Sequence, residues 1–216
     1  LAFIGTDVAI EKELLQEAVR EVVSDTFNMI TVDGDTSTND TLLCMANGLA
    51  ENEKIVCKDA NYEAFKEALY FVCEGLAKTM AADGEGASKL FEATIVNAKS
   101  KEDAKNLARA IVGSNLSKAA IFGCDANFGR FLCAMGYSGA TFDQNDVELF
   151  FKSANGELKV FDKGTPIVFD EDKALEIMKA DAVTVYVNMN EGDASATAWG
   201  CDLTYDYVKI NADYRS

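Results

Sequence analysis

The 216 residues are 49% hydrophobic with a single proline, which allows a sizeable core and is typical of one continuous unit over residues 1–216. A surplus of 36 acidic over 20 basic residues gives a net charge of −16, which argues against a nucleic-acid partner because such binding needs clustered lysine and arginine. The complete absence of histidine excludes Ser-His-Asp triads, Cys-His pairs and HExxH zinc sites, so any catalysis must use carboxylates, hydroxyls, amines or groups from elsewhere.

The chain starts with LAFIGTD, an apolar run that ends in a turn, as expected of an interior strand and not of a polar, frayed terminus. Either a polypeptide was trimmed here or a longer precursor was cut ahead of a folded strand. Apolar residues at helical spacing then predict an amphipathic helix over residues 10–23, with Asp7 as its cap. The same spacing predicts a second helix over residues 59–83.

Strands and helices alternate in the rest of the chain. A strand over residues 91–98 precedes a helix over 100–113 that Ser100 caps, and residues 117–123 (SKAAIFG) predict a buried strand. Further strands are predicted over residues 147–152, 155–161, 165–170 and 182–189, with a helix over residues 171–181. An Asn-Gly turn joins the first two of these strands as a hairpin. The interleaved elements predict an α/β fold with a mixed sheet.

Compartment and redox state are predicted from composition. No run of about 18 apolar residues is present and the first ten residues lack the basic segment of a secretion signal, so a cytoplasmic protein is expected. The six cysteines form no C-x-x-C pair, which fits neither a zinc cage nor a disulfide scaffold. We expect them to be reduced and mostly to pack.

Residues 31–41 (TVDGDTSTNDT) crowd Asp33, Asp35 and Asp40 among hydroxyl side chains. The spacing begins like a calcium-binding loop but lacks the required glycine and the bidentate glutamate that close such a loop. The stretch is therefore interpreted as a turn in which these side chains bond nearby backbone amides.

Two glycine-bearing stretches are candidates for chemistry. ADGEGASK places Glu85 between two glycines directly after a long helix, where a carboxylate either faces solvent or has a task. GCDANFGRFLCAMGYSG runs from strand to helix, with Asp125 as the expected cap and Arg130 one turn later. It lacks the phosphate-binding glycine patterns, so a packing role is favoured over an anion site.

The end of the chain, WGCDLTYDYVKINADYRS, predicts a short helix capped by Asp202. Its apolar side chains, Tyr205 and Val208 among them, favour a docked tail. Held near a cavity, Asn211, Arg215 and Ser216 could bind a small polar ligand. The alternative is a helix that only covers a core edge.

Four stretches occur in a fixed order: TVDGDTSTND, GEGASK, DANFGR followed by GYSG, and the C-terminal WGCDLTYDYVKINADYRS. Together they resemble the ornithine acetyltransferase family, also called glutamate N-acetyltransferase. The resemblance extends from LAFIGTD to the last residue. Ala126 and Phe128 depart from it, since the family often has proline and tryptophan there, but both keep apolar bulk and a helix start.

The resemblance implies a processed enzyme of arginine biosynthesis. In that family the precursor cleaves itself at an Ala-Thr bond, which gives an α chain and a β chain that begins with threonine. The present chain is then expected to be the β chain, with the nucleophilic threonine two positions before Leu1. Activated by its own N-terminal amine, this threonine would take the acetyl group from N2-acetyl-L-ornithine and pass it to L-glutamate.

The resemblance also implies the surroundings of the site. The expected fold is a layered α/β sandwich of mixed sheets flanked by helices and completed by a separate α chain, often as an α2β2 assembly. Oxyanion donors and a substrate-binding lysine are expected on the α chain. No cofactor and no metal ion are expected.

Carried over position by position, the substrate contacts of the family fall on Glu85, Asn211 and the terminal Ser216. Glu85 is expected to pair with a substrate ammonium, and Asn211 can offer both a donor and an acceptor. Ser216 would contribute its hydroxyl or carboxylate, although many family members end in threonine. Two alternatives stay open, a self-cleaving aminopeptidase or amidase and a non-catalytic subunit that binds a metal. Acetyl-CoA as a second donor also stays open.

Overall fold

The computed structural model describes residues 1–213, which form two compact units. The first unit comprises Leu1–Asn28 and Asp35–Leu76, and the second comprises Met29–Gly34 and the residues from Ala77 onward. Each unit has its own cluster of buried hydrophobic side chains. The single continuous unit predicted for a two-chain enzyme stays a prediction.

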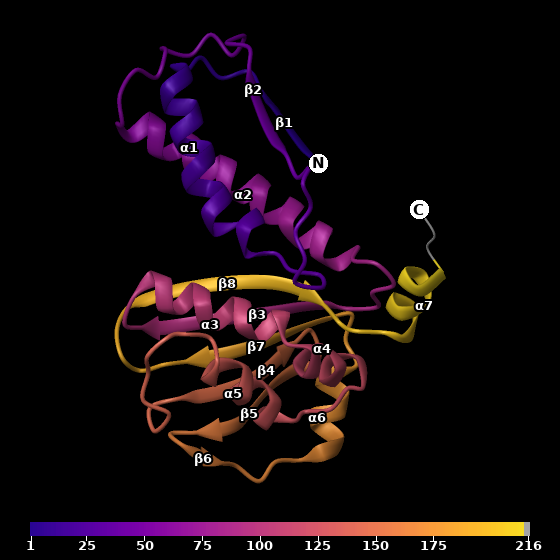
Figure 1. Ribbon diagram of the computed structural model, residues 1–216. Helices are drawn as coiled ribbons and strands as arrows, with labels where there is room; N and C mark the ends of the chain where they lie inside the picture. Colours follow the sequence, from indigo (N-terminus) through magenta and orange to yellow (C-terminus); the bar gives the residue numbers. More distant parts are fainter. Residues whose placement is uncertain (214–216) are drawn as a thin grey trace. The chain divides into compact units, whose positions relative to one another are not determined.

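The first unit pairs a small sheet with two helices. β1 (Ala2–Thr6) and β2 (Leu42–Ala46) are parallel and lie along one side of α1 (Lys12–Asp25) and of α2 (Ala60–Ala82), whose first part belongs to this unit (Figure 1). Buried side chains form the core of this unit: Ile4, Ala18, Val22, Ile55, Tyr62, Leu69 and Cys73.

Asp7 does not cap the first helix, so that prediction is wrong. The chain stays extended as far as Ile10, which forms a parallel bridge with Ile55, and the Glu11 N–H donates to the Ile55 carbonyl at 2.9 Å. The helix therefore starts only after Glu11, without a side-chain cap. Tertiary pairing decided this boundary, because the bridge at Ile10 lies beyond Asp7, the best local capping residue.

The second unit is built on a six-stranded sheet in the order β6-β5-β4-β7-β3-β8 (Figure 1). Its strands are β3 (Leu90–Ala98), β4 (Glu148–Ser153), β5 (Gly156–Asp162), β6 (Thr165–Pro166), β7 (Ala182–Asn188) and β8 (Ala194–Cys201). β3 is parallel to β7 and antiparallel to β8, which confirms the predicted mixed sheet. The β4–β5 hairpin is also confirmed, whereas the strand predicted over residues 165–170 shortens to the two residues of β6.

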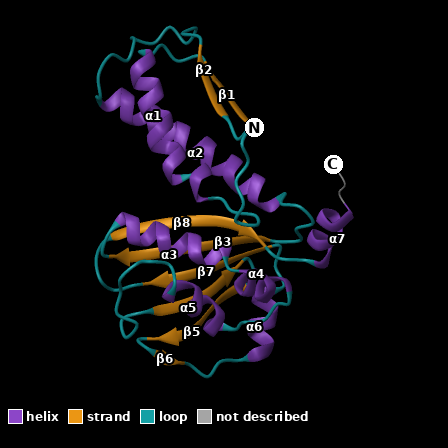
Figure 2. Cartoon of the chain, viewed as in Figure 1, coloured by secondary structure: helices purple, strands orange, loops and turns teal. Residues whose placement is uncertain are grey.

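Helices flank this sheet, as the purple elements of Figure 2 show. They are α3 (Lys101–Gly113), α4 (Asn115–Phe122), α5 (Phe128–Gly136), α6 (Glu171–Met178) and α7 (Tyr205–Asp213). A 3-10 turn, η1 (Phe27–Met29), has its first two residues in the first unit and its last residue in the second. The Asp103 N–H donates to Ser100 Oγ at 3.1 Å, so the predicted cap is confirmed. The sheet flanked by helices confirms the predicted α/β class.

The strand predicted over residues 117–123 is wrong, because these residues lie in and directly after α4. Ser114 starts this helix, since its Oγ accepts a hydrogen bond from the Ser117 N–H at 3.3 Å. A short apolar run has no periodicity that separates a strand from a buried helix. The two alanines in it favour the helix, because alanine has the highest helix propensity.

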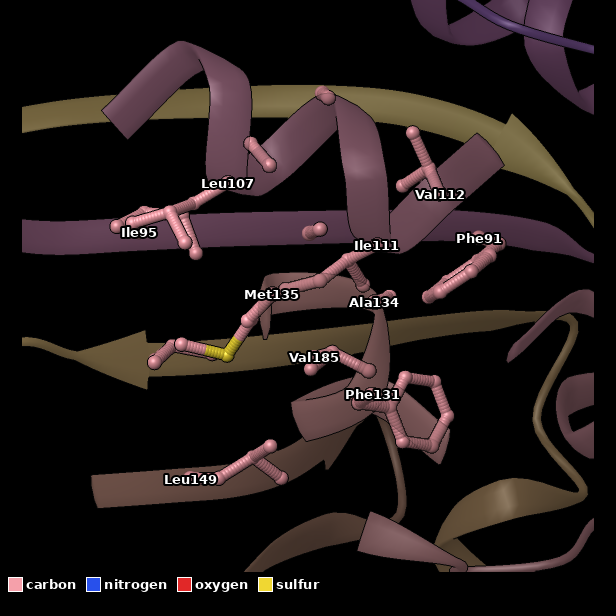
Figure 3. Close-up of a cluster of buried hydrophobic side chains, with 14 of the residues drawn as sticks. Phe91, Ile95, Leu107, Ile111, Val112, Phe131, Ala134, Met135, Leu149 and Val185 are labelled. Atoms are coloured by element: carbon pink, nitrogen blue, oxygen red, sulfur yellow. The ribbon is translucent and has the colours of Figure 1, made fainter. Parts of the chain in front are cut away.

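The core of the second unit lies between the sheet and the helices α3 and α5 (Figure 3). Leu107 and Ile111 of α3 and Phe131 of α5 are fully buried against Ile95 of β3 and Val185 of β7. Close packing of this layer makes the sheet rigid, and the loops at its strand ends are therefore held in defined positions.

Two further predictions concern composition. All six cysteines are free in the structure, as expected, with Cys73 and Cys201 buried. Within residues 1–213, none of the helices combines the length and the apolar composition that a membrane crossing requires.

The start of β4 leads to a testable prediction about the pH dependence of stability. Glu148 accepts hydrogen bonds from Lys159, Asn190 and Asn188, and these bonds, that of the Lys159 ammonium first, lower the pKa of the carboxyl from 4.5 to about 2. Because this pKa is lowered in the folded state, the stabilisation is present above pH 4.5 and is lost as the pH falls toward 2. Glu148→Gln should therefore be less stable than the wild type at pH 7.

Urea denaturation at several pH values checks this prediction. The stability difference between wild type and Glu148→Gln should shrink as the pH falls below 4.5. Glu157→Gln, which removes an exposed partner of Lys152 in the same hairpin, is the control and should show a small difference. A difference for Glu148→Gln that does not vary with pH would contradict the prediction.

Candidate functional site

The loop between α2 and β3 carries Glu85 and is shaped by its glycines. The Ala87 N–H donates to the Gly84 carbonyl at 2.9 Å, which closes a turn around Glu85 and leaves its side chain exposed. A Cβ at Gly84 would lie 2.7 Å from Cys201 Sγ, and one at Gly86 would lie 2.7 Å from the Tyr207 backbone nitrogen. Glycine is thus required at both positions because backbone and thiol approach too closely for any side chain.

Asp202 fastens this loop to the end of β8. The Asp202 side chain is buried, and Oδ1 accepts hydrogen bonds from the Ser88 N–H at 2.8 Å and the Lys89 N–H at 3.0 Å, while Oδ2 accepts one from the Ser88 hydroxyl. Charge-assisted bonds of this kind are stronger than neutral ones. The prediction that Asp202 caps the C-terminal helix is wrong, since its carboxylate is engaged by the loop.

Thr204 caps α7 instead. Its Oγ1 accepts hydrogen bonds from the Asp206 N–H at 3.2 Å and the Tyr207 N–H at 3.4 Å, and its hydroxyl donates to the Gly86 carbonyl at 2.6 Å. One hydroxyl therefore starts the helix and binds it to the Glu85 loop. The sequence contained a signal for this residue, because threonine directly before the first helical residue is also a preferred cap.

The α7 helix brings Asn211 to Glu85. Asn211 Nδ2 donates to Glu85 Oε2 at 2.8 Å and to the Tyr207 carbonyl at 3.0 Å. Both side chains are exposed, and within the described residues Asn211 Oδ1 and Glu85 Oε1 make no hydrogen bond. The pair therefore offers a carboxylate and an amide acceptor toward solvent, a combination that suits an ammonium group. Ser216, the third predicted residue, lies outside the described residues.

The apolar docking predicted for the C-terminal helix is wrong, because none of the described residues of α7 is buried. Tyr205 is 84% exposed, and its ring lies edge-on to that of Phe122 at 5.6 Å between centroids. Polar contacts at the start of the helix hold it in place, and the apolar side chains do not.

Asp33 of the acidic segment contacts the same helix. Tyr207 Oη donates to Asp33 Oδ2 at 3.0 Å. Residues 1–213 contain no group of three or more His, Cys, Asp or Glu side chains that could hold a metal ion. Asp33 thus takes part in placing α7, and the calcium interpretation gains no support.

The DANFGR stretch packs rather than cradling an anion. Asp125 does not cap α5, because the helix begins only at Phe128, after Asn127, and has no side-chain cap. Arg130 lies 3.8 Å from the Asp125 carboxylate. Ala126 belongs to the core, and the Phe128 ring lies 5.8 Å from that of Phe161.

Two lysines near the site were not singled out from the sequence. Lys89 Nζ donates to the Met178 carbonyl at 2.6 Å and the Ile121 carbonyl at 3.3 Å, both at helix C-termini, where a cation is favoured. It also lies 2.9 Å from Cys124 Sγ. Lys118 is buried, and its Nζ donates to the Cys201 carbonyl. Neither role has a local sequence signal, because both depend on chain segments that meet only in the fold.

In comparisons with known proteins, a family model matches the chain, and curated relatives that share one name are similar to it. A family model described as "ArgJ family" matches residues 1–216. Curated relatives named "Arginine biosynthesis bifunctional protein ArgJ" include one from Caldanaerobacter subterraneus, 51% identical over the whole chain, and one from Bacillus subtilis, 49% identical. The chain spans about half the length of these relatives, 54% and 52% respectively.

A solved structure is also similar. The crystal structure of "Arginine biosynthesis bifunctional protein argJ" from Bacillus halodurans is 44% identical in sequence, with a TM-score of 0.93. The match covers 99% of this chain and 99% of the solved chain.

Gly86→Ala tests how the loop holds α7. The residue has φ +68°, which costs roughly 1–2 kcal/mol for a side chain, and the new Cβ would also collide with the Tyr207 backbone. We expect α7 to detach, with faster amide hydrogen exchange over residues 202–213. Gly136→Ala is the control, since nothing lies within 4 Å of that position. Unchanged exchange in Gly86→Ala would contradict the described docking.

Proposed function

This chain belongs to the ArgJ family, and on that premise we propose that it is one half of an acetyltransferase of arginine biosynthesis. The enzyme moves the acetyl group of N2-acetyl-L-ornithine to L-glutamate through an acetyl-threonine intermediate. The names of the curated relatives support the pathway. Their description as bifunctional also supports acetyl-CoA as a second acetyl donor.

The observation that carries the proposal is the hydrogen bond between Asn211 and Glu85. Two positions that are 126 residues apart in the chain, and that the family resemblance assigns to substrate binding, lie 2.8 Å from each other. Glu85 binds the substrate ammonium. Asn211 orients the Glu85 carboxylate through its amide nitrogen, and its amide oxygen binds the amino-acid part of the substrate. Ser216 completes the contacts at the end of the chain.

The reaction proceeds in two acyl transfers. The threonine hydroxyl attacks the acetyl carbonyl, the bond to ornithine breaks, and the amine leaves with a proton. The amine of glutamate then attacks the acetyl-threonine ester, which regenerates the hydroxyl. A chain without histidine needs a different base, and the α-amine of an N-terminal threonine is such a base. This threonine is not among residues 1–216, and oxyanion donors and a lysine come from the α chain.

The exposed apolar face of the β1–β2 sheet is an argument for a partner chain. Phe3 and Met45 are 64% and 55% exposed, and Leu1 and Leu43 lie on the same face of the two strands. Parallel strands are normally covered on both faces, whereas here helices cover only one. We propose that the α chain, the other half of the family's length, covers this face, as part of an α2β2 assembly.

Glu85→Gln tests the substrate contact. Loss of a charged hydrogen bond to the substrate ammonium should lower kcat/KM for N-acetylornithine about tenfold or more. Acetyl transfer is measured in the two-chain protein with glutamate as acceptor, and ping-pong kinetics are expected. Glu102→Gln, an exposed carboxylate on α3, is the control and should leave the rate unchanged. Equal rates for wild type and Glu85→Gln would return Glu85 to the role of a surface acid.

The same assay separates the alternatives. An aminopeptidase or amidase would release the acyl group to water and would need no glutamate. A metal-binding subunit would show no transfer at all, and calorimetry would detect its calcium. Mass spectrometry after addition of N-acetylornithine alone should show an acetylated threonine, and its absence would contradict the covalent intermediate.

Phe3→Glu and Met45→Glu test the proposed partner surface. Each places a charge in an apolar face that the α chain is expected to bury, so the two chains should copurify poorly and the native mass should fall. Val168→Glu is the control, because this side chain is 99% exposed in the second unit and lies outside the sheet face. Intact assembly of both sheet variants would exclude this face as the contact.

A further inference from the structure

We infer that Lys118, which contacts neither Glu85 nor Asn211, is the positioning residue that sets the geometry of this pair. The inference rests on the proposed function, in which that pair binds substrate. It concerns a buried lysine on α4 for which the two-step reaction has no use.

Lys118 is buried, and the hydrogen bond of its ammonium group is made to the turn at residues 201–203. Its side chain is 2% exposed, and Nζ donates to the Cys201 carbonyl and lies 3.4 Å from Cys201 Sγ. No ion pair between Lys118 and a carboxylate is found within the described residues. A buried amine is unfavourable unless it is hydrogen-bonded, so these contacts are strongly held.

The backbone of the same residue holds the same turn. The Leu203 N–H donates to the Lys118 carbonyl at 3.3 Å. Lys118 therefore fixes Cys201 through its side chain and Leu203 through its backbone. The residue between them is Asp202, whose carboxylate binds the loop of Glu85.

These bonds form a closed circuit through α4. From Lys118 the circuit runs to the turn at 201–203, from Asp202 to the backbone of Lys89, and from Lys89 Nζ back to the Ile121 carbonyl on α4. In a closed circuit each bond restrains the others. The loop that carries Glu85 and the turn that leads into α7 are thus both hydrogen-bonded, directly or through one further residue, to the same helix, α4.

The side chain of Lys118 closes this circuit at a buried point. Removal of the amine would leave the Cys201 carbonyl without its buried donor and free the turn to move. Asp202 and Thr204, which lie one and three residues further on, would then shift the Glu85 loop and the start of α7 separately. A displacement of about 1 Å between binding groups is enough to cost a large factor in rate.

Lys118→Met tests the inference in the assembled two-chain protein, because methionine keeps the volume and removes the donor. Amide hydrogen exchange should accelerate over residues 84–89 and 202–211, and KM for N-acetylornithine should rise about tenfold with kcat changed less than about threefold. In a double-mutant cycle with Glu85→Gln, the two losses should be clearly less than additive.

Lys159→Met is the matched control. It removes a hydrogen-bonded ammonium from the same unit, at the β4–β5 hairpin, and should lower stability without a change in KM or in exchange at the two segments. Should Lys118→Met fail to assemble, Lys118→Gln, which retains a neutral donor, is measured in the same way and should show a smaller change in the same direction.

The outcomes separate the inference from the proposed function. A loss of thermal stability with unchanged exchange and unchanged KM, as expected for Lys159→Met, would overturn the positioning role. Faster exchange with additive losses would overturn it as well. If Glu85→Gln alone leaves kcat/KM unchanged, the proposed substrate contact of Glu85 fails, while hydrogen exchange over residues 84–89 and 202–211 still decides whether Lys118 places the two segments.

Discussion

The carboxylate of Asp202 holds together two segments that are 114 residues apart in the chain. It accepts two backbone N–H groups and a hydroxyl from Ser88 and Lys89, and it does so in a buried position. Everything at the candidate site depends on this contact. The loop on one side of it carries Glu85, and the helix that follows on the other side carries Asn211. Neither segment has an apolar interior of its own, so polar bonds with defined direction place both.

The register of the sheet makes this contact possible. Leu90 at the start of β3 pairs with Cys201 at the end of β8, so the residues that adjoin them, Lys89 and Asp202, must meet. A slip of one residue would turn Asp202 to the other face of the sheet. Packing of α3 and α5 against one face fixes the register, because the buried side chains of β3 alternate with half-buried ones (Figure 3). A hydrophobic core on one face of the sheet thus determines a polar site at its edge.

Much of the fold was predictable because its signals are local. The alternation of valines in residues 182–189, the helix cap at Ser100 and the hairpin turn each act within a few residues, and each was confirmed. The errors share a physical cause. The start of α1 was decided by the bridge between Ile10 and the distant Ile55, and the short apolar run in α4 had no period of its own. Residues whose conformation depends on distant partners carry no reliable local pattern.

At the candidate site, too, some features were evident from the sequence and others only from the fold. The sequence by itself determined which residue types are available, that imidazole chemistry is excluded, and that Glu85 and Asn211 are the polar positions to examine. It did not determine that these two touch or that Asp202 binds a loop while Thr204 caps the helix. Nor did it determine that Lys118 is buried and bonded to Cys201. Only the tertiary structure decided these points, because each contact joins segments whose distance is set by sheet register and helix packing, and no short stretch of sequence records either.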